Sequence, residues 1–253
     1  MIYASDLDRT LIYSKSFLEG YSGEVVPVEE NTNGEVISYI SKMALENLKE
    51  ISSKIDFIPV TTRSFQEYKR TLFFDMVPFA IIDNGGCILY YGKPIAEWEE
   101  RLSRILREYN LESVVEMFDG KSFVSRKPSI IDGKFVFFKQ MDEIACMNFC
   151  KDNLDSRLYT FEIQRKKVYI IPRFISKQNA LRYLVQAKNC QKIIASGDSA
   201  LDEGIIKASN FAVVPRHSTM NFDNLLDNNY VVTEAEGLEC AEEITTKVLE
   251  NIG

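Results

Sequence analysis

The chain contains one histidine, His217, and this scarcity limits the chemistry of its functional site. A metal site built from several histidines is excluded. A Ser-His-Asp or Cys-His site would have to use this single imidazole. His217 follows Pro215 and Arg216 in an expected loop, and we expect it to lie at the surface. The chemistry is therefore expected to rest on carboxylates, hydroxyls and lysines.

Cysteines are few, odd in number and without the spacing of a zinc site. The five are Cys87, Cys146, Cys150, Cys190 and Cys240. This pattern predicts buried, reduced thiols, as is typical of a cytoplasmic protein.

Long apolar runs and an excess of basic charge are also missing. No uninterrupted apolar stretch approaches the roughly 18 residues that span a membrane. Residues 1–5 lead directly into acidic residues, without the basic and apolar segments of a secretory signal, so we expect a cytoplasmic protein without membrane contact. The net charge of -7 argues against a nucleic-acid partner, which would require a basic excess.

Short β-prone runs alternate with amphipathic helices near both ends of the chain. The expected strands are residues 1–6, 56–60, 79–82, 192–196 and 211–214. The expected helices are residues 35–54, 64–72, 176–187, 202–208 and 238–251, the second with a Ser64–Glu67 capping box. Such alternation predicts an α/β fold with a doubly wound parallel sheet.

The middle of the chain has a different pattern. The expected elements are helices at 97–109 and 142–154 and strands at 122–126, 134–139, 157–164 and 167–172. This order predicts a small α+β module inserted into the α/β core. We therefore expect a core of residues 1–94 and 173–253 and an inserted domain of residues 95–172. Its cations Arg126, Lys127, Lys139, Arg165 and Lys166 are expected to be mostly solvated surface residues.

Two carboxylates, Asp6 and Asp8, directly follow the first strand. In a doubly wound sheet, the carboxyl ends of the strands form the ligand crevice. One carboxylate can serve as nucleophile or metal ligand while its neighbour transfers protons. The competing interpretation is a pair of solvated aspartates in a turn.

Asp198 and Asp202 follow the strand at 192–196, after the turn residue Gly197. Mg²⁺ prefers oxygen ligands and is usually held by one or two carboxylates with phosphate and water. Acidic residues that complement a helix dipole would explain Asp202, but they would leave Asp198 unexplained.

Thr61 and Lys177 can supply the donors that a phosphate group needs. Thr61 lies at the end of the strand at 56–60, where its hydroxyl and backbone N–H groups can bind phosphate oxygens. Lys177 opens a helix, and a cation in the first turn is unfavourable for the helix dipole. This placement is explained if Lys177 reaches an anion, although either residue alone is more often structural.

Four ordered segments resemble the four motifs of the haloacid dehalogenase superfamily. They are Asp6-Leu7-Asp8-Arg9-Thr10, Val60-Thr61-Thr62-Arg63, Ser176-Lys177 before Asn179-Ala180-Leu181, and Gly197-Asp198-Ser199 with Asp202. The inserted module resembles the type IIB (Cof-like) cap of sucrose-phosphate phosphatases and related enzymes. The resemblance implies a Rossmann-like core with a cap, and an Mg²⁺-dependent phosphatase acting on a small phosphorylated substrate such as a sugar or polyol phosphate.

The resemblance also implies roles for individual residues. Asp6 would attack phosphorus to form an aspartyl-phosphate, and Asp8 would protonate the leaving oxygen and then deprotonate water. Mg²⁺ would be held by Asp6, Asp8 (through its backbone carbonyl), Asp198 and Asp202. Phosphoryl oxygens would be bound by Thr61, Lys177 and Thr10, and substrate by Arg9, Arg63 and Asn84.

Two positions depart from the superfamily pattern. Arg9 stands where the family usually has glycine, and Leu201 replaces an asparagine that often precedes the last aspartate. Neither departure removes a required carboxylate. Two alternatives stay open: a sugar phosphomutase that shares these motifs, and a non-catalytic ligand-binding or regulatory protein with this fold.

Overall fold

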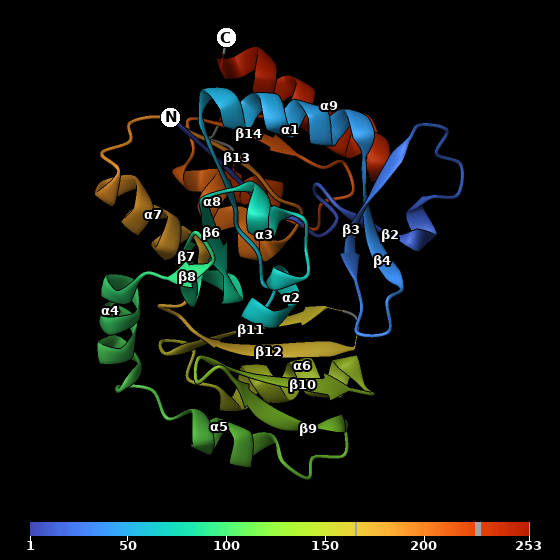
Figure 1. The fold of residues 1–253 in the computed structure, drawn as a ribbon. Helices are drawn as coiled ribbons and strands as arrows, with labels where there is room; N and C mark the ends of the chain where they lie inside the picture. The colour runs from blue at the N-terminus through green and yellow to red at the C-terminus, as the bar shows by residue number, and fades with distance from the viewer. Residues whose placement is uncertain (165, 226–228, 253) are drawn as a thin grey trace. The chain divides into compact units, whose positions relative to one another are not determined.

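The computed structural model describes residues 1–164, 166–225 and 229–252 (Figure 1). The chain divides into two units. Met1–Ile95 and Ser176–Gly253 make up the first, and Ala96–Ile175 the second.

A five-stranded parallel sheet forms the centre of the first unit. Its order is β15 (Tyr230–Val232), β14 (Phe211–Val214), β13 (Ile193–Ser196), β1 (Ile2–Ser5) and β5 (Asp56–Pro59). All four residues of β1 are buried because it lies between two other strands. This arrangement confirms the predicted α/β core with a doubly wound parallel sheet.

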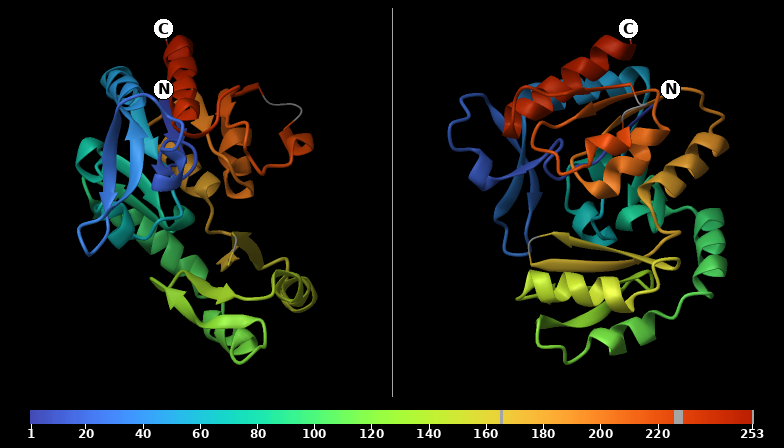
Figure 2. Two further views of the ribbon diagram at one scale, coloured as in Figure 1. Left: turned by 90° about the vertical axis from the view of Figure 1, so that its right-hand side faces the viewer. Right: turned by 180° about the vertical axis from the view of Figure 1, so that it is seen from behind.

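Helices flank this sheet (Figures 1 and 2). They are α1 (Lys42–Lys54), α7 (Lys177–Ala187), α8 (Glu203–Ala208) and α9 (Gly237–Ile252). Helices α1 and α9 pack against each other, and their apolar residues share one core cluster with Tyr3 and Phe57 of the sheet. The rings of Tyr3 and Phe57 stack with centroids 5.4 Å apart.

Two three-stranded antiparallel sheets complete the first unit. One is ordered β2 (Tyr13–Ser14), β4 (Val36–Ser41), β3 (Val25–Glu30), and the other β6 (Phe79–Ile82), β7 (Cys87–Tyr90), β8 (Lys93–Pro94). Short helices are η1 (Lys15–Phe17), α2 (Phe65–Lys69), α3 (Phe73–Met76), η2 (Asp83–Gly85), η3 (Ala200–Asp202) and η4 (Phe222–Leu225). The predicted Ser64–Glu67 capping box is confirmed at the start of α2.

The structure corrects two expected elements of the first unit. Residues 36–41, expected as the start of a helix, form β4 because they pair with β3. The Ser41 hydroxyl then accepts a hydrogen bond from the Ala44 N–H and caps α1. The expected parallel strand at 79–82 pairs antiparallel with β7 and adjoins the segment after β5 through a parallel bridge, Val60 to Ile81.

The second unit is an α+β module. Its elements are α4 (Ala96–Leu106), α5 (Leu111–Phe118), β9 (Val124–Ile131), β10 (Phe135–Gln140), α6 (Glu143–Asn153), β11 (Tyr159–Gln164) and β12 (Lys167–Pro172). The sheet is antiparallel, ordered β11-β12-β10-β9. This confirms the predicted inserted α+β domain, although α5 was not predicted.

One apolar core holds the second unit together. Val136 and Phe138 of β10 pack with Val168 and Ile170 of β12 and with Phe118 of α5. The intervening Phe137 stands outside this cluster, against Tyr169, because side chains alternate between the two faces of a strand. The cations Arg126, Lys127, Lys139 and Lys166 are exposed, and Arg165 lies outside the described residues.

All five cysteines are free, and all but the half-buried Cys190 are buried, largely as predicted. Among the described residues, no helix has the length and apolarity to cross a membrane.

Candidate active site

Three parallel strands end at one edge of the central sheet and bring their following residues together. Ser5 at the end of β1 is in register with Pro59 of β5 and Ser196 of β13. The Asp6 N–H donates to the Ser196 carbonyl at 2.9 Å. Asp6, Thr61 and Asp198, which lie far apart in sequence, therefore occupy the same edge, as the strand-end pattern predicts.

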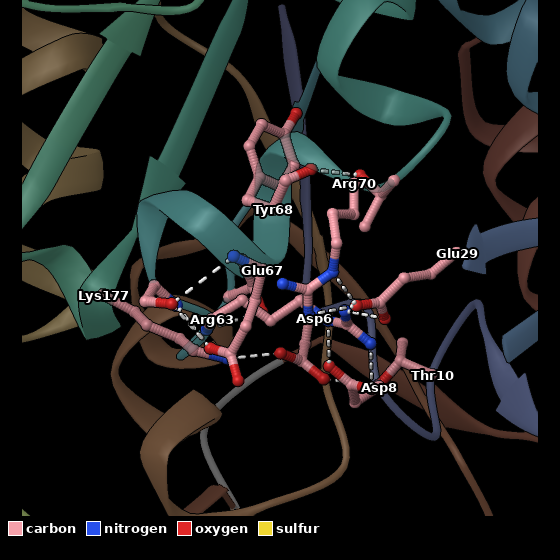
Figure 3. Close-up of polar contacts among 12 residues, drawn as sticks. Asp6, Asp8, Thr10, Glu29, Arg63, Glu67, Tyr68, Arg70 and Lys177 are labelled. Carbon is pink, nitrogen blue, oxygen red and sulfur yellow. Dashed lines mark hydrogen bonds and ion pairs between the residues drawn. The ribbon is translucent and has the colours of Figure 1, made fainter. Parts of the chain in front are cut away.

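Lys177 is the central cation of this edge. Its side chain is buried, and its Nζ donates to Asp6 Oδ1 at 2.5 Å (Figure 3) and to Asp202 Oδ1 at 2.6 Å. Burial alone would lower the pKa of Lys177, but the Asp202 and Asp6 carboxylates raise it above its usual value. Lys177 therefore remains charged, and it reaches anions as its unfavourable place in the first turn of α7 suggested.

Asp6, Asp198 and Asp202 form a compact acidic cluster. Each offers a carboxylate oxygen, and these oxygens lie within 4.8 Å of one another. Burial raises the pKa of Asp6 well above its ordinary value, although Lys177 opposes the shift. Burial, followed by repulsion from Asp202, raises the pKa of Asp198 to about 7. An oxygen-rich, acidic and largely buried donor set of this kind fits a hard divalent cation such as Mg²⁺.

Both oxygens of Asp202 already have partners. Oδ1 accepts from Lys177, while Oδ2 accepts from the Ser199 N–H at 3.1 Å and the Ser199 hydroxyl at 2.9 Å. A Cβ atom on Gly197 would lie 2.3 Å from Asp202 Cβ, so the absence of a side chain permits this close approach. Asp6 Oδ1 likewise accepts from Lys177, and its Oδ2 faces the Thr10 hydroxyl at 3.4 Å, so Asp198 is the freest of the three carboxylates for a cation, and Asp202 orients Lys177.

A second charged group surrounds Asp8. Arg63 Nε and Nη2 donate to the two Asp8 oxygens at 2.7 and 2.8 Å, and Arg63 Nη1 donates to Glu29. Arg70 Nη2 also donates to Glu29, at 2.8 Å (Figure 3). Burial would lower the pKa of Arg63, but Asp8 and Glu29 raise it. The side chain of Asp8 is therefore held by an arginine rather than joined to the acidic cluster.

Glu29 and Arg70 were not predicted as site residues. Glu29 belongs to β3, and its side chain is only 2% exposed. Its charge is balanced by two arginines from the segment after β5 and from the end of α2. Glu29 follows Pro27 and Val28 in a β-prone run, which is only a weak sign that it is buried. Its arginine partners lie at least 34 residues away in sequence, so no local pattern indicates them.

The predicted phosphate-binding hydroxyls lie at this edge. The Thr10 hydroxyl contacts Asp6 Oδ2 at 3.4 Å. Thr61 is fully buried, and its hydroxyl accepts from the Arg63 N–H at 3.2 Å. The Asn84 N–H donates to the Thr61 carbonyl at 3.0 Å, and the buried Oδ1 of Asn84 has no hydrogen-bond partner among the described residues. Asn84 therefore lies beside Thr61, and its side-chain oxygen can accept a hydrogen bond from a ligand.

The Asn84 turn has an unusual backbone. Asp83, Asn84 and Gly85 have φ values of 51°, 56° and 95°. A Cβ atom on Gly85 would lie 2.2 Å from the Ser176 carbonyl oxygen. Gly85 therefore allows this turn to approach the residue that caps α7, next to Lys177.

The structure also corrects the expected surface position of His217. This residue is half-buried, and its Nε2 lies 2.8 Å from the Arg9 carbonyl. Burial lowers the pKa of His217 below its usual value. Arg9 itself extends to the acidic cluster, with its Nε 3.4 Å from Asp198 Oδ2.

Comparisons with known proteins agree with this geometry. The family model of sucrose-6F-phosphate phosphohydrolase matches residues 1–244. A comparison with curated protein sequences found no match.

Several solved structures share the fold over nearly the whole chain. The sucrose-phosphatase of Synechocystis sp. PCC6803, in complex with sucrose and phosphate, has a TM-score of 0.72 and 15% identity, covering 100% of this chain and 97% of that chain. A haloacid dehalogenase-like hydrolase from B. subtilis has a TM-score of 0.60 and 15% identity, with coverages of 97% and 98%. A phosphatase of this superfamily from Bacteroides thetaiotaomicron has a TM-score of 0.57 and 15% identity, with coverages of 100% and 94%. With residues 1–244 matched, the chain belongs to the sucrose-6F-phosphate phosphohydrolase family and is a phosphatase of the haloacid dehalogenase superfamily.

Proposed function

We propose that the chain is an Mg²⁺-dependent phosphatase that hydrolyses a small sugar or polyol phosphate through an aspartyl-phosphate on Asp6. The observation that carries this proposal is the buried Asp6 carboxylate, held by Lys177 at 2.5 Å within a cluster that also contains Asp198 and Asp202. A nucleophile, a fixed cation and oxygen ligands for a metal lie together at one sheet edge.

The first step joins an Asp6 oxygen to phosphorus as the bond from phosphorus to the leaving oxygen breaks. Asp8 gives a proton to that oxygen, so the alcohol departs neutral. Thr61 and Lys177 bind the phosphoryl oxygens and keep phosphorus in line with Asp6. Phosphoryl transfer depends mainly on such positioning and on charge stabilisation.

The second step returns Asp6 to its starting state. Asp8, now a carboxylate, takes a proton from a water molecule whose oxygen attacks phosphorus, and the bond to Asp6 breaks. Mg²⁺, held by Asp6, Asp198 and the Asp8 backbone carbonyl, would supply positive charge for the phosphoryl oxygens. Arg63 donates two hydrogen bonds to the Asp8 carboxylate, the form that accepts the proton from water in this step.

A sugar phosphate is the substrate class that the family relationship favours. The matching family model is that of an enzyme named for sucrose-6F-phosphate, and the similar Synechocystis enzyme was solved with sucrose and phosphate. Asn84 adds a buried, unpartnered acceptor that can receive a substrate hydroxyl. We propose the second unit, residues 95–172 in the sequence-based boundaries, as the cap that selects the substrate.

The test is release of inorganic phosphate from sugar, polyol and nucleotide phosphates, with Mg²⁺ or with EDTA. Asp6→Asn is expected to abolish release. The exposed Asp152→Asn in α6 is the matched control and should leave release intact. Intact-mass analysis of acid-quenched enzyme should detect a phosphoryl adduct that Asp6→Asn lacks. Folded protein that releases no phosphate from any compound would overturn the proposal and favour a mutase or a binding protein.

A further inference from the structure

Arg9 adopts a backbone conformation that is unusual for a residue with a side chain. Its φ is 62°, in the left-handed region that favours glycine. The turn that contains it is fixed by hydrogen bonds from the Arg9 N–H to the Ile12 carbonyl at 2.8 Å and from the Ile12 N–H to the Leu7 carbonyl at 2.9 Å. This turn therefore holds Arg9 in a conformation that an arginine would not adopt by preference.

Two side chains fix the carbonyl group of Arg9. The Tyr13 hydroxyl donates to it at 3.0 Å, and His217 Nε2 lies 2.8 Å from it. A carbonyl oxygen only accepts hydrogen bonds, so the proton of the neutral imidazole is on Nε2. Nδ1 of His217 is buried and has no hydrogen-bond partner within residues 1–164, 166–225 and 229–252, in agreement with this tautomer. The nearby Tyr13 and the distant His217 thus anchor the Arg9 backbone.

The guanidinium of Arg9 is directed at Asp198 without a hydrogen bond. Arg9 Nε lies 3.4 Å from Asp198 Oδ2, and this buried nitrogen has no hydrogen-bond partner in the part of the chain that the structure describes. The Arg9 side chain is 42% exposed, whereas that of Asp198 is 11% exposed. The contact is therefore electrostatic, and the Arg9 side chain is the member of the pair that is open to solvent.

Asp198 is the fixed member of the pair. Its backbone carbonyl accepts from the Ser218 hydroxyl at 2.9 Å and from the Thr219 N–H at 2.8 Å. These donors belong to the loop that also carries His217. One loop therefore holds the backbones of both Arg9 and Asp198, and the end of the Arg9 side chain is the part that is free to move.

We infer that Arg9 is an internal cation for Asp198, that a divalent metal ion displaces it on binding, and that Arg9 thereby weakens the metal affinity of the site. The inference rests on the proposed function, because it takes Asp198 as a metal ligand. Two cations beside one carboxylate repel each other, and the half-exposed Arg9, unlike the buried Lys177, has solvent into which its guanidinium can withdraw when the metal binds. Without Arg9, the three clustered carboxylates would retain Lys177 as their close cation and attract the metal more strongly.

The test is isothermal titration calorimetry of MgCl₂ into EDTA-treated, dialysed full-length protein. Because the Arg9 side chain is 42% exposed, its pair with Asp198 is expected to be worth less than about 1 kcal/mol, as surface ion pairs are, so Arg9→Gln should lower the Mg²⁺ Kd roughly two- to fivefold. Arg9→Lys retains the charge and should stay near the wild-type Kd. Arg157→Gln is the matched control, because Arg157 pairs with Asp155 in the second unit. A gain in affinity is not a result that misfolding produces.

Specific outcomes would overturn the inference. A Kd for Arg9→Gln that equals or exceeds that of the wild type would do so, as would equal gains for Arg9→Gln and Arg9→Lys. If Arg9→Gln does not fold, Arg9→Gly replaces it, since glycine adopts a φ of 62° without strain. Asp198→Asn separates this inference from the proposed function: wild-type Mg²⁺ binding by that variant would refute Asp198 as a ligand. Lost binding there, with an unchanged Kd in Arg9→Gln, would refute the role of Arg9 alone.

Discussion

Arg63 holds Asp8 by both carboxylate oxygens, from Nε at 2.7 Å and from Nη2 at 2.8 Å. The planar guanidinium matches a carboxylate in this two-point arrangement, whereas an ammonium group does not. Glu29 contacts the opposite end of the same guanidinium. The orientation of Asp8, the proposed proton donor, therefore depends on Arg63 and, through Arg63, on Glu29. Glu29 lies outside all four motif segments.

Arg63→Lys is expected to lower kcat while changing KM less. Lysine keeps the charge but loses the two-point contact, and misplacement of a catalytic group by about 1 Å can cost about 100-fold. We expect a decrease of about 10- to 100-fold, measured by steady-state phosphate release. Arg104→Lys, at an exposed ion pair in α4, is the control. An unchanged kcat would show that Asp8 does not depend on Arg63 during turnover.

Glu29→Gln is expected to destabilise the fold. The change leaves Arg63 and Arg70 without the buried charge that lies between them, and breaking a buried pair typically costs about 3–5 kcal/mol. Arg63 keeps Asp8 as a partner and Arg70 is one-third exposed. We therefore expect the free energy of unfolding, measured in urea, to fall by about 3 kcal/mol. Glu24→Gln, at an exposed pair with Lys42, should cause no measurable change. Equal stability of the two variants would contradict this account.

Lys177→Met is expected to unfold more readily than the wild type. It leaves the buried carboxylates of Asp6 and Asp202 facing each other without a cation, at a cost of about 3–5 kcal/mol. Adding Asp6→Asn should restore part of the loss, because one of the unpaired charges disappears. Thermal unfolding of the single and double variants in EDTA measures this coupling. Additive losses would show that Lys177 stabilises the fold by packing rather than by charge.

Asp198→Asn is expected to stabilise the metal-free protein at high pH. A carboxyl whose pKa is about 7 in the folded state, against 3.8 ordinarily, costs stability as pH rises above the lower value. The cost is complete above the folded pKa. In EDTA we expect the free energy of unfolding of the variant to exceed that of the wild type by about 2 kcal/mol at about pH 8 and to equal it at about pH 4. The gain at the higher pH is reduced because the variant loses the contact with Arg9. A loss of stability at the higher pH would refute this linkage.

His217→Gln is expected to reduce the loss of stability in acid. Burial lowers the pKa of His217 in the folded state, and this effect outweighs the hydrogen bond to the Arg9 carbonyl, which raises the pKa. The charge of Arg9 lowers it and Glu236 raises it. A histidine of this kind destabilises the fold as pH falls below its unfolded value near 6.5, because the unfolded chain binds the proton more readily. Glutamine keeps an N–H donor for the Arg9 carbonyl but does not titrate. Between about pH 7.5 and about pH 5, Tm should fall less in this variant than in the wild type.

The sheet and the edge that carries the site were predictable from local patterns. One β-prone run ends at Asp6 and another ends one residue before Gly197-Asp198, and the order of strands and helices predicts a parallel sheet with both aspartates at one edge. The position of Lys177 in a first helical turn pointed to a nearby anion. These predictions could be made because the order of the elements and the types of the residues that follow them indicated the same arrangement.

Other parts depended on contacts that local patterns do not encode. Val36 and Ile40 fit a helical spacing of four, but the same spacing also fits a strand with a period of two. Residues 36–41 form a strand because they pair with β3. His217 was expected at the surface because its neighbours suggest a loop, yet that loop turns back to the Arg9 carbonyl. Glu29 has no local sign of its two arginine partners.

The position of β1 between β5 and β13 has a consequence for the order in which the protein is made. β1 and β5 leave the ribosome early, but the second neighbour of β1 follows only after all of Ala96–Ile175 has been synthesised. Lys177 is added 171 residues after Asp6, which is roughly 10–30 s later at typical bacterial and eukaryotic elongation rates. During that interval β1 lacks β13 as its second neighbour and Asp6 lacks the cation of Lys177, while the whole second unit is synthesised before the core is complete.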